Sequence, residues 1–286
     1  MNKTIQSCVV VFTCLLIFIS QTATALEGEV SQKSIMGSIS KHKIYFDIYL
    51  PKDYKSGSKK YPVIYFLHGK GRGSKTPKPE TGLFKFYDDA INSGKLPPLI
   101  VVAPNSRATN MWGDAKDKSS MAETYVIKEL IPHIDSEYRT ISDRKGRIIE
   151  GFSMGGFGAA MYGSKFPELF CGTICLDGAM HTWDTLKKKY ADSIASKVFE
   201  LDGDHFNKYS PHHQVGANVK NINKYSMEFL IMVGRLKEYN IKFKDVLDKN
   251  KIPYKYINTP MAHTPKVREY DLDSYCDFIK RKLSGK

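Results

Sequence analysis

The sequence has few of the features that mark several specialised classes of protein. Its 286 residues include five cysteines and two tryptophans, with no internal repeat and no low-complexity segment. So few cysteines exclude a disulfide-rich scaffold, and no cysteine–histidine spacing matches a zinc site. The sequence also has no basic run interleaved with aromatic residues and no nucleic-acid-binding motif. We therefore expect no nucleic acid partner.

Long hydrophobic runs are absent after the first 25 residues. At the N-terminus, Lys3 precedes the apolar segment 8–20, and residues 23–25 form a small-x-small cleavage pattern. The apolar run is too short to cross a bilayer comfortably, so the pattern predicts a secretory signal peptide over residues 1–25; an uncleaved anchor is the alternative. We expect a mature protein that begins near Leu26, has no membrane span and is secreted or periplasmic.

Acidic residues are scarce relative to basic ones. Lysine and arginine total 43 against 30 aspartate and glutamate, a formal net charge of +13. In an exported protein this balance favours an anionic envelope, an acidic polysaccharide or an anionic substrate, and it is explained equally well by solubility alone. Cys171, Cys175 and Cys276 follow the signal segment, and three thiols cannot all pair within one chain. We interpret them as mostly structural, with a disulfide through Cys276 left open.

Strand and helix patterns alternate along the rest of the chain. Ile44, Phe46, Ile48 and Leu50 alternate with polar residues, which predicts an antiparallel strand with one solvated face. Continuous apolar runs predict strands buried on both faces. Expected strands occupy 61–69, 99–105, 147–153, 170–180, 227–234 and 254–260, and expected helices occupy 121–138, 155–166, 239–250 and 273–283. This order predicts an α/β fold with a mostly parallel sheet, antiparallel N-terminal strands and helices on both faces. We expect one domain over 26–286, with 181–227 as an insertion or cap.

A glycine-rich stretch surrounds Ser153. The segment Gly151-Phe152-Ser153-Met154-Gly155 matches the G-x-S-x-G nucleophile elbow, and it lies between an expected strand and an expected helix. A serine at such a sharp turn leaves no room for side chains two positions before and after it, so glycine is needed there. Ser153 is therefore the predicted nucleophile, and a structural turn is the alternative.

An earlier strand ends in a second glycine-rich loop. The sequence FLHGKGRG covers residues 66–73. Elbow chemistry needs an oxyanion donor from such a loop, so we assign the backbone N–H groups of Lys70 and Met154 to this role, with Gly69 beside the substrate. His68 precedes the serine, whereas the base of this arrangement follows it, so we interpret His68 as shaping the loop.

Together these stretches resemble a known family. The motifs YFLHGKG, VVAPNSRATNMWGDA, ELIPHIDSEYRT, GFSMGGFGAAMYGSKFPELF and YKYINTPMAHT are similar to the esterase branch of the α/β-hydrolases. That branch includes feruloyl and acetyl-xylan esterases, S-formylglutathione hydrolases, siderophore esterases and mycolyltransferases. The resemblance covers nearly all of the chain after residue 35. It implies an α/β-hydrolase fold and ester cleavage or acyl transfer without a metal or organic cofactor.

The resemblance and the chain order together indicate the other catalytic residues. His263 follows the last expected strand and is the last of eight histidines, so it is the predicted base. The acid is expected on the loop after the strand 227–234. The family pattern there is Gly-x-x-Asp, but Lys237 occupies the aspartate position and Glu238 follows it. We predict Glu238 as the acid, with Asp245 and Asp248 as alternatives.

Two tryptophans and a lysine run are candidates for substrate contacts. Trp112 lies on a loop at the carboxyl end of the sheet, where ligands bind in open α/β folds, and packing under that loop is the alternative. Trp183 in the insertion is expected to form a second wall. The run 187–190 reads KKKY and is interpreted as a solvated helix face in preference to an anion clamp.

These observations predict a secreted serine carboxylesterase with a Ser-His-Glu triad and an acyl-enzyme intermediate. Its expected partner is a small-molecule or carbohydrate ester, such as an acetyl, feruloyl or siderophore ester. One alternative is an envelope acyltransferase that uses the same acyl-enzyme. Another is a non-catalytic binding protein on a hydrolase scaffold, which the displaced acid supports.

Overall fold

The computed structural model describes residues 26–71, 81–106 and 110–285. The predicted signal peptide lies outside these residues. Within the described part of the chain, no helix is long and apolar enough to cross a membrane.

One mixed sheet forms the centre of the molecule. Its strand order is β1-β2-β4-β3-β5-β6-β7-β8, with β1, β2 and β4 paired antiparallel and the strands from β4 through β3 to β8 paired parallel. The strands are β1 (Glu29–Met36), β2 (Lys43–Leu50), β3 (Val63–Leu67), β4 (Ile100–Asn105), β5 (Arg147–Phe152), β6 (Gly172–Leu176), β7 (Phe229–Val233) and β8 (Tyr254–Asn258). The expected mostly parallel sheet with antiparallel N-terminal strands is confirmed.

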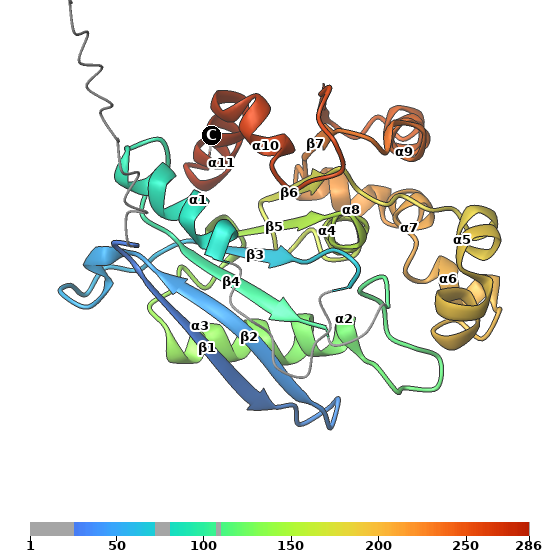
Figure 1. Ribbon diagram of the computed structural model, residues 1–286, viewed down its shortest axis with the longest axis horizontal. Coiled ribbons are helices and arrows are strands. Elements are labelled where there is room, and N and C mark those ends of the chain that lie inside the picture. Colours follow the sequence, from blue (N-terminus) through green and yellow to red (C-terminus); the bar gives the residue numbers. More distant parts are fainter. Residues whose placement is uncertain (1–25, 72–80, 107–109, 286) are drawn as a thin grey trace, which may run out of the picture.

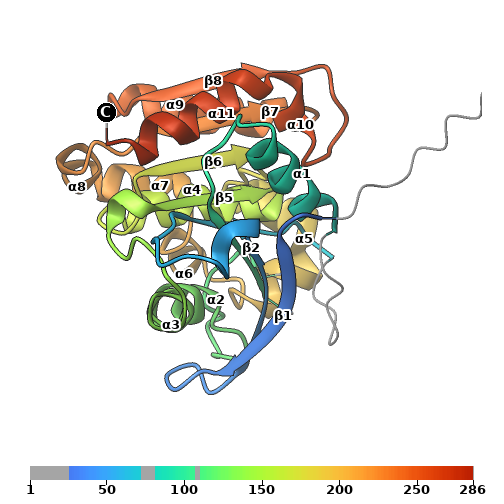
Figure 2. The ribbon, with the colours of Figure 1, turned by 90° about the vertical axis from the view of Figure 1, so that its left-hand side faces the viewer.

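Helices cover both faces of the sheet (Figures 1 and 2). Helices α1 and α11 pack on one face, and α3, α4, α7 and α9 contribute to the core on the other face. The helices are α1 (Thr81–Asn92), α2 (Ala122–Thr124), α3 (Ile131–Glu137), α4 (Met154–Lys165), α5 (Trp183–Tyr190), α6 (Gly203–Asn207), α7 (Pro211–Ala217), α8 (Val219–Lys224), α9 (Lys237–Lys249), α10 (Val267–Tyr270) and α11 (Leu272–Leu283). Shorter helical segments are η1 (Lys52–Tyr54), η2 (Tyr125–Leu130), η3 (Arg144–Gly146) and η4 (Ala191–Ala195).

The buried strands divide their side chains between two hydrophobic clusters. On β3, Val63, Tyr65 and Leu67 belong to the cluster under α3 and α4, whereas Ile64 and Phe66 belong to the cluster under α1 and α11. Successive side chains of a strand point to opposite faces, so a strand that is apolar throughout must be covered on both sides. This explains why the sequence shows continuous apolar runs in the centre of the sheet.

The segment between β6 and β7, which the sequence predicts to be an insertion and which we call by that name, is helical. It contains α5, η4, α6, α7 and α8, and α7 packs against α4. Phe206 of α6 contacts Phe157 of α4, with 6.0 Å between the ring centroids. The insertion is therefore joined to the helix that follows the predicted nucleophile.

Candidate active site

Ser153 occupies the turn between β5 and α4. Its backbone has φ 55° and ψ −114°, a conformation that residues other than glycine rarely adopt. A Cβ atom on Gly151 would lie 2.1 Å from the carbonyl oxygen of Gly155, and one on Gly155 would lie 1.8 Å from the carbonyl oxygen of Leu67. Both contacts are far below van der Waals distance. Glycine is therefore required on each side of Ser153, as its spacing in the sequence predicts.

His263 lies between Ser153 and a buried aspartate. The Nε2 atom of His263 is 2.8 Å from Ser153 Oγ, and its Nδ1 atom is 2.6 Å from Asp177 Oδ2. An ionised carboxylate can only accept, so Nδ1 carries the proton and Nε2 is free to accept one from the serine. The three groups form an acid–base–nucleophile chain of the kind used in acyl transfer.

Glu238 is not part of this chain, which corrects the expectation from the sequence. Glu238 lies in the first turn of α9, and the alternative Asp245 lies farther along that helix. Both side chains are exposed. Asp177 instead follows β6 directly and is fully buried. The carboxylate beside His263 thus comes one strand earlier in the chain than the family pattern implies.

The loop after β7 has a different role from the expected one. Its amides bind the acid: Gly234 N and Leu236 N donate to Asp177 Oδ1 over 3.0 Å and 2.9 Å, and Arg235 N donates to Oδ2 over 3.2 Å. The loop therefore fixes the position of the Asp177 carboxylate without contributing a carboxylate of its own.

The loop after β3, which we call the oxyanion loop after the role expected for Lys70, lies against the elbow. A Cβ atom on Gly69 would be 3.3 Å from Ser153 Cβ, so the backbone of this loop approaches the nucleophile closely. Lys70 follows it at the surface. Met154 is the first residue of α4, and the first N–H groups of a helix have no acceptor within the helix. The amides proposed from the sequence therefore belong to the two segments that meet beside Ser153.

His68 shapes this loop, as expected. Its Nδ1 lies 2.8 Å from Gly69 O, and its Nε2 accepts a hydrogen bond from Ser106 N over 3.2 Å. Trp112 packs on it with ring centroids 4.9 Å apart and donates from Nε1 to His68 O over 3.1 Å. The imidazole of His68 thus contacts backbone atoms of Gly69 and Ser106 and positions both loops.

Trp112 does not form a wall around Ser153. Trp112 is fully buried in the core, because its indole N–H finds a partner under the loop at His68 O. It is therefore a packing residue, and the prediction of a substrate wall is wrong. Trp183 is half-buried and packs on Phe206 within the insertion, with ring centroids 5.5 Å apart.

A buried ionic cluster lies beneath the elbow. Glu150, three residues before Ser153, is fully buried. It accepts hydrogen bonds from Tyr275 over 2.7 Å, from Tyr87, and from Arg268 over 3.2 Å. Burial raises the pKa of both tyrosines well above the usual range, so they act as donors. Because Arg268 belongs to α10, this cluster joins the strand of Ser153 to the helix that follows the His263 loop.

The cysteines are separate from this site. Cys171, Cys175 and Cys276 are buried free thiols. Burial raises the pKa of Cys171 and of Cys276 to about 11, and it raises the pKa of Cys175 further. Thiolates are the reactive form, so these cysteines behave as small apolar residues. Among the described residues Cys276 has no disulfide partner.

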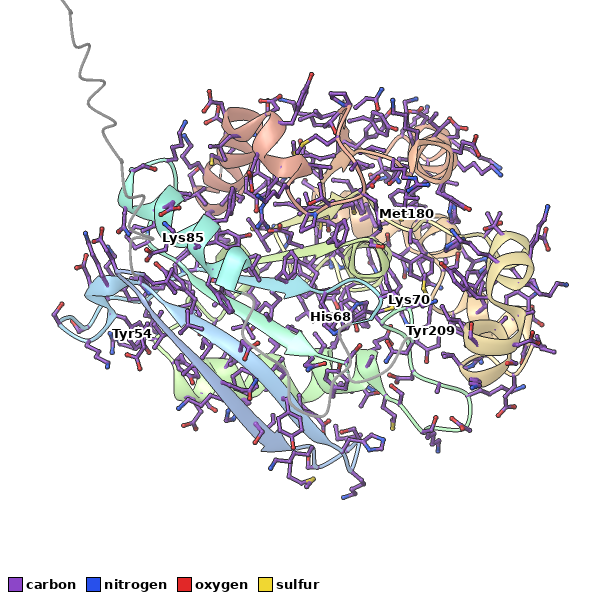
Figure 3. The ribbon with its side chains drawn as sticks, viewed as in Figure 1. Tyr54, His68, Lys70, Lys85, Met180 and Tyr209 are labelled. Carbon is purple, nitrogen blue, oxygen red and sulfur yellow. The ribbon has the colours of Figure 1, made fainter. Side chains whose placement is uncertain are left out.

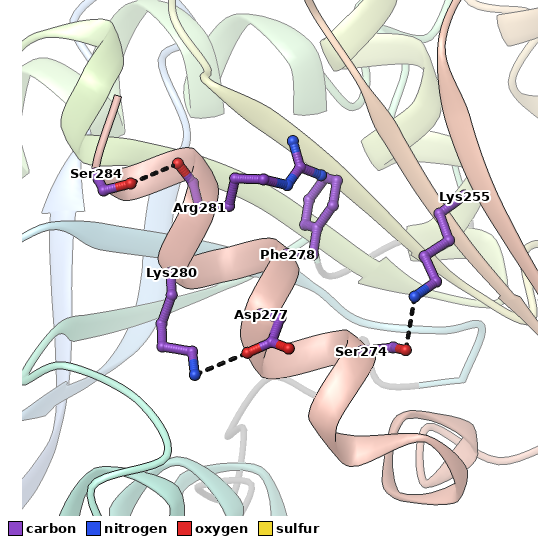
Figure 4. A pocket seen from close by; sticks show the side chains of 7 residues that line it. All are labelled: Lys255, Ser274, Asp277, Phe278, Lys280, Arg281 and Ser284. Atoms are coloured by element: carbon purple, nitrogen blue, oxygen red, sulfur yellow. Dashed lines mark hydrogen bonds and ion pairs between the residues drawn. The ribbon is translucent and has the colours of Figure 1, made fainter. Parts of the chain in front are cut away.

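A surface hollow lies over α11 (Figure 4). Its lining consists of Lys255, Ser274, Asp277, Phe278, Lys280, Arg281 and Ser284, and it includes none of the triad residues. Within the ranges that the structure describes, no group of three or more histidine, cysteine or acidic side chains is arranged to hold a metal ion.

Known proteins share this arrangement of sequence and fold. The family model described as putative esterase matches residues 37–255. The chain belongs to this family. It is 33% identical over 170 residues to an esterase of Mycobacterium tuberculosis, which corresponds to 55% of this chain and 34% of that protein. It is also 30% identical over 147 residues to an endo-1,4-beta-xylanase/feruloyl esterase of Xylanibacter ruminicola, covering 49% of this chain and 20% of that protein. The chain thus spans about a third or less of these curated relatives.

Solved structures show the same fold at lower identity. A ferulic acid esterase superposes with a TM-score of 0.74 at 22% identity, covering 91% of this chain and all of that one. An S-formylglutathione hydrolase from Staphylococcus aureus superposes with a TM-score of 0.69 at 18% identity, covering 88% of this chain and 98% of that one. The fold is therefore that of the α/β-hydrolase esterases, as expected.

Proposed function

We propose that the protein is a serine carboxylic ester hydrolase that uses Ser153, His263 and Asp177. The single observation that carries this proposal is the pair of contacts that His263 makes, 2.8 Å to Ser153 Oγ and 2.6 Å to Asp177 Oδ2. The non-catalytic alternative depended on a displaced acid, and Asp177 removes that support. Family membership agrees with the proposal.

In this mechanism His263 Nε2 takes the proton of Ser153 as Oγ attacks the ester carbonyl carbon. The N–H groups of Met154 and Lys70 stabilise the oxyanion. When the tetrahedral intermediate collapses, the ester C–O bond breaks and the imidazolium gives its proton to the leaving alcohol. Asp177 stabilises that imidazolium. Water then attacks the acyl-serine, again with His263 as base, and the acid is released as Ser153 regains its proton.

We also propose that the protein is exported and acts on carbohydrate or siderophore-type esters. The N-terminal signal pattern supports export, and the relative named as a feruloyl esterase supports carbohydrate-borne acetyl or feruloyl groups. Transfer of the acyl group to an alcohol in place of water is distinguished by product analysis with and without an acceptor alcohol.

A fluorophosphonate probe tests the nucleophile. The folded protein should label at Ser153 and hydrolyse 4-nitrophenyl acetate, and the Ser153→Ala variant should do neither at a comparable rate. Peptide mapping identifies the labelled residue. Labelling at another site, or none in protein with native circular dichroism, would overturn the proposal.

A further inference from the structure

Lys70 connects the oxyanion loop to the helical insertion. It follows Gly69, whose backbone faces Ser153, and its Nζ atom lies 4.2 Å from the ring centroid of Tyr190 at the end of α5. Figure 3 shows Lys70 beyond the carboxyl end of β3, toward the part of the molecule that holds α5 and α6. A cation–π contact between Lys70 and Tyr190 therefore connects the insertion to the loop beside Ser153.

Lys189 approaches the same ring from within the insertion. Its Nζ atom is 5.6 Å from the ring centroid of Tyr190 and 5.9 Å from that of Tyr239. Tyr239 lies in the first turn of α9, three residues after Leu236, whose amide binds Asp177. We call Lys70, Lys189, Tyr190 and Tyr239 the lysine–tyrosine rim. It thus joins the loops that hold the oxyanion donors and the acid.

A histidine supports the rim from below. The ring of His181 packs edge-on against Tyr239 and Tyr190, with centroids 4.7 Å and 5.6 Å apart. The chain holds this histidine close to the nucleophile, because Ala179 N donates to the backbone oxygen of Ser153 over 2.8 Å. The rim therefore packs against the segment that follows Asp177, and this segment is hydrogen-bonded to the elbow.

The two ammonium groups of the rim are available to a ligand. Lys70 and Lys189 are both exposed, and among the described residues no carboxylate lies within 4.0 Å of either group. Several other lysines of the chain, such as Lys116 and Lys165, are paired with acidic side chains. Charges of one sign beside a reactive centre raise the local concentration of an oppositely charged substrate.

We propose that the lysine–tyrosine rim binds a negatively charged group on the substrate, so that Ser153 acts preferentially on anionic esters. This inference rests on the proposed esterase function and narrows its substrate class. A carboxylate, phosphate or sulfate would lie between the ammonium groups of Lys70 and Lys189, with the tyrosine rings supporting the apolar part of the ligand. The anionic group belongs either to the acyl part or to the alcohol part of the ester.

Two pairs of esters separate these sources. On the acyl side, the 4-nitrophenyl half-ester of adipic acid is compared with 4-nitrophenyl hexanoate. On the alcohol side, 4-acetoxybenzoate is compared with methyl 4-acetoxybenzoate. At low salt we expect kcat/KM to favour the anionic member of at least one pair by about fivefold or more, as two partly exposed charge contacts would give. The preference should fall as sodium chloride is raised to about 0.5 M, where screening is strong.

Charge removal supplies the matched control. Lys189→Gln should reduce the ratio of kcat/KM for anionic over neutral esters several-fold, mainly by raising KM for the anionic esters. Lys220→Gln removes the same charge from an exposed position of α8 and should preserve the preference. Equal kcat/KM within both pairs, or equal loss of preference in both variants, would overturn the inference while neutral ester turnover upholds the esterase function. Folded protein that cleaves none of the four esters would overturn the function itself.

Discussion

Asp177 and His263 are 86 residues apart in the chain, and Asp177 Oδ2 lies 2.6 Å from His263 Nδ1. Three backbone amides of the loop after β7 bind the same carboxylate. This relationship fixes the tautomer of the imidazole and places its other nitrogen against Ser153.

The first prediction concerns this acid. Asp177→Asn should lower kcat by roughly 10⁴-fold with KM changed much less, because the amide cannot stabilise the imidazolium and favours the wrong tautomer. Steady-state hydrolysis of 4-nitrophenyl acetate measures the effect. Glu238→Gln is the control and should retain full turnover. A large loss in the Glu238 variant with little in the Asp177 variant would reverse the assignment.

A second prediction concerns the buried ionic cluster. Glu150→Gln leaves the guanidinium of Arg268 buried without a counter-charge, which should lower the free energy of unfolding by about 3–5 kcal/mol. Urea denaturation measures it. Asp277→Asn breaks an exposed pair with Lys280 and should lower the free energy of unfolding far less. Equal effects in the two variants would show that burial does not set the strength of the Glu150 pair.

The third prediction concerns pH. Burial, followed by the charge of Lys189, lowers the pKa of His181 to about 4, below its unfolded value near 6.5. As the pH falls, His181 is therefore protonated in the unfolded chain before it is protonated in the folded one. The free energy of unfolding that is present above pH 6.5 is lost as the pH falls toward 4, by about 3 kcal/mol. His181→Phe keeps an aromatic ring without this titration. Its unfolding free energy should fall less between pH 7.5 and 4.5, and an unchanged loss would contradict the prediction.

The fourth prediction concerns the elbow glycines. Gly155→Ala should yield little folded protein, because the added Cβ would meet the backbone oxygen of Leu67 at 1.8 Å. Gly82→Ala is its control, since a Cβ there has nothing within 4 Å, and it should stabilise α1 by up to about 1 kcal/mol. Thermal unfolding compares the two. Normal expression and melting of Gly155→Ala would contradict the clash.

The sequence was sufficient for the parts of the fold that depend on local pattern. The apolar runs placed the buried strands, and the glycine spacing placed Ser153, because each depends on neighbours close in the chain. Helix α1 was not expected, although Leu83, Phe84, Tyr87 and Ile91 recur at helical spacing and are buried. This spacing is the sequence signal of an amphipathic helix.

The acid and the tryptophans required the tertiary structure. Asp177 is an aspartate at the carboxyl end of a buried strand, a position that points to a functional site in parallel sheets. Choosing Asp177 over Glu238 requires knowing whether the loop after β6 or the loop after β7 places a carboxylate beside His263. That depends on which strands are neighbours in the sheet. Trp112 likewise has the residue type and the sequence position expected of a substrate wall. Only the packing of its indole beneath the oxyanion loop places it in the core.

The backbone of Ser153 has a further consequence for anyone who wishes to trap a bound ester. Holding a serine at φ 55° consumes on the order of 1–3 kcal/mol of folding free energy. Glycine adopts this conformation freely and alanine does not. A disabled protein with glycine at this position should therefore melt at a higher temperature than one with alanine, and it is the better host for intact substrate. The native protein is therefore less stable than it would be with glycine at this position, because the serine hydroxyl must be kept there.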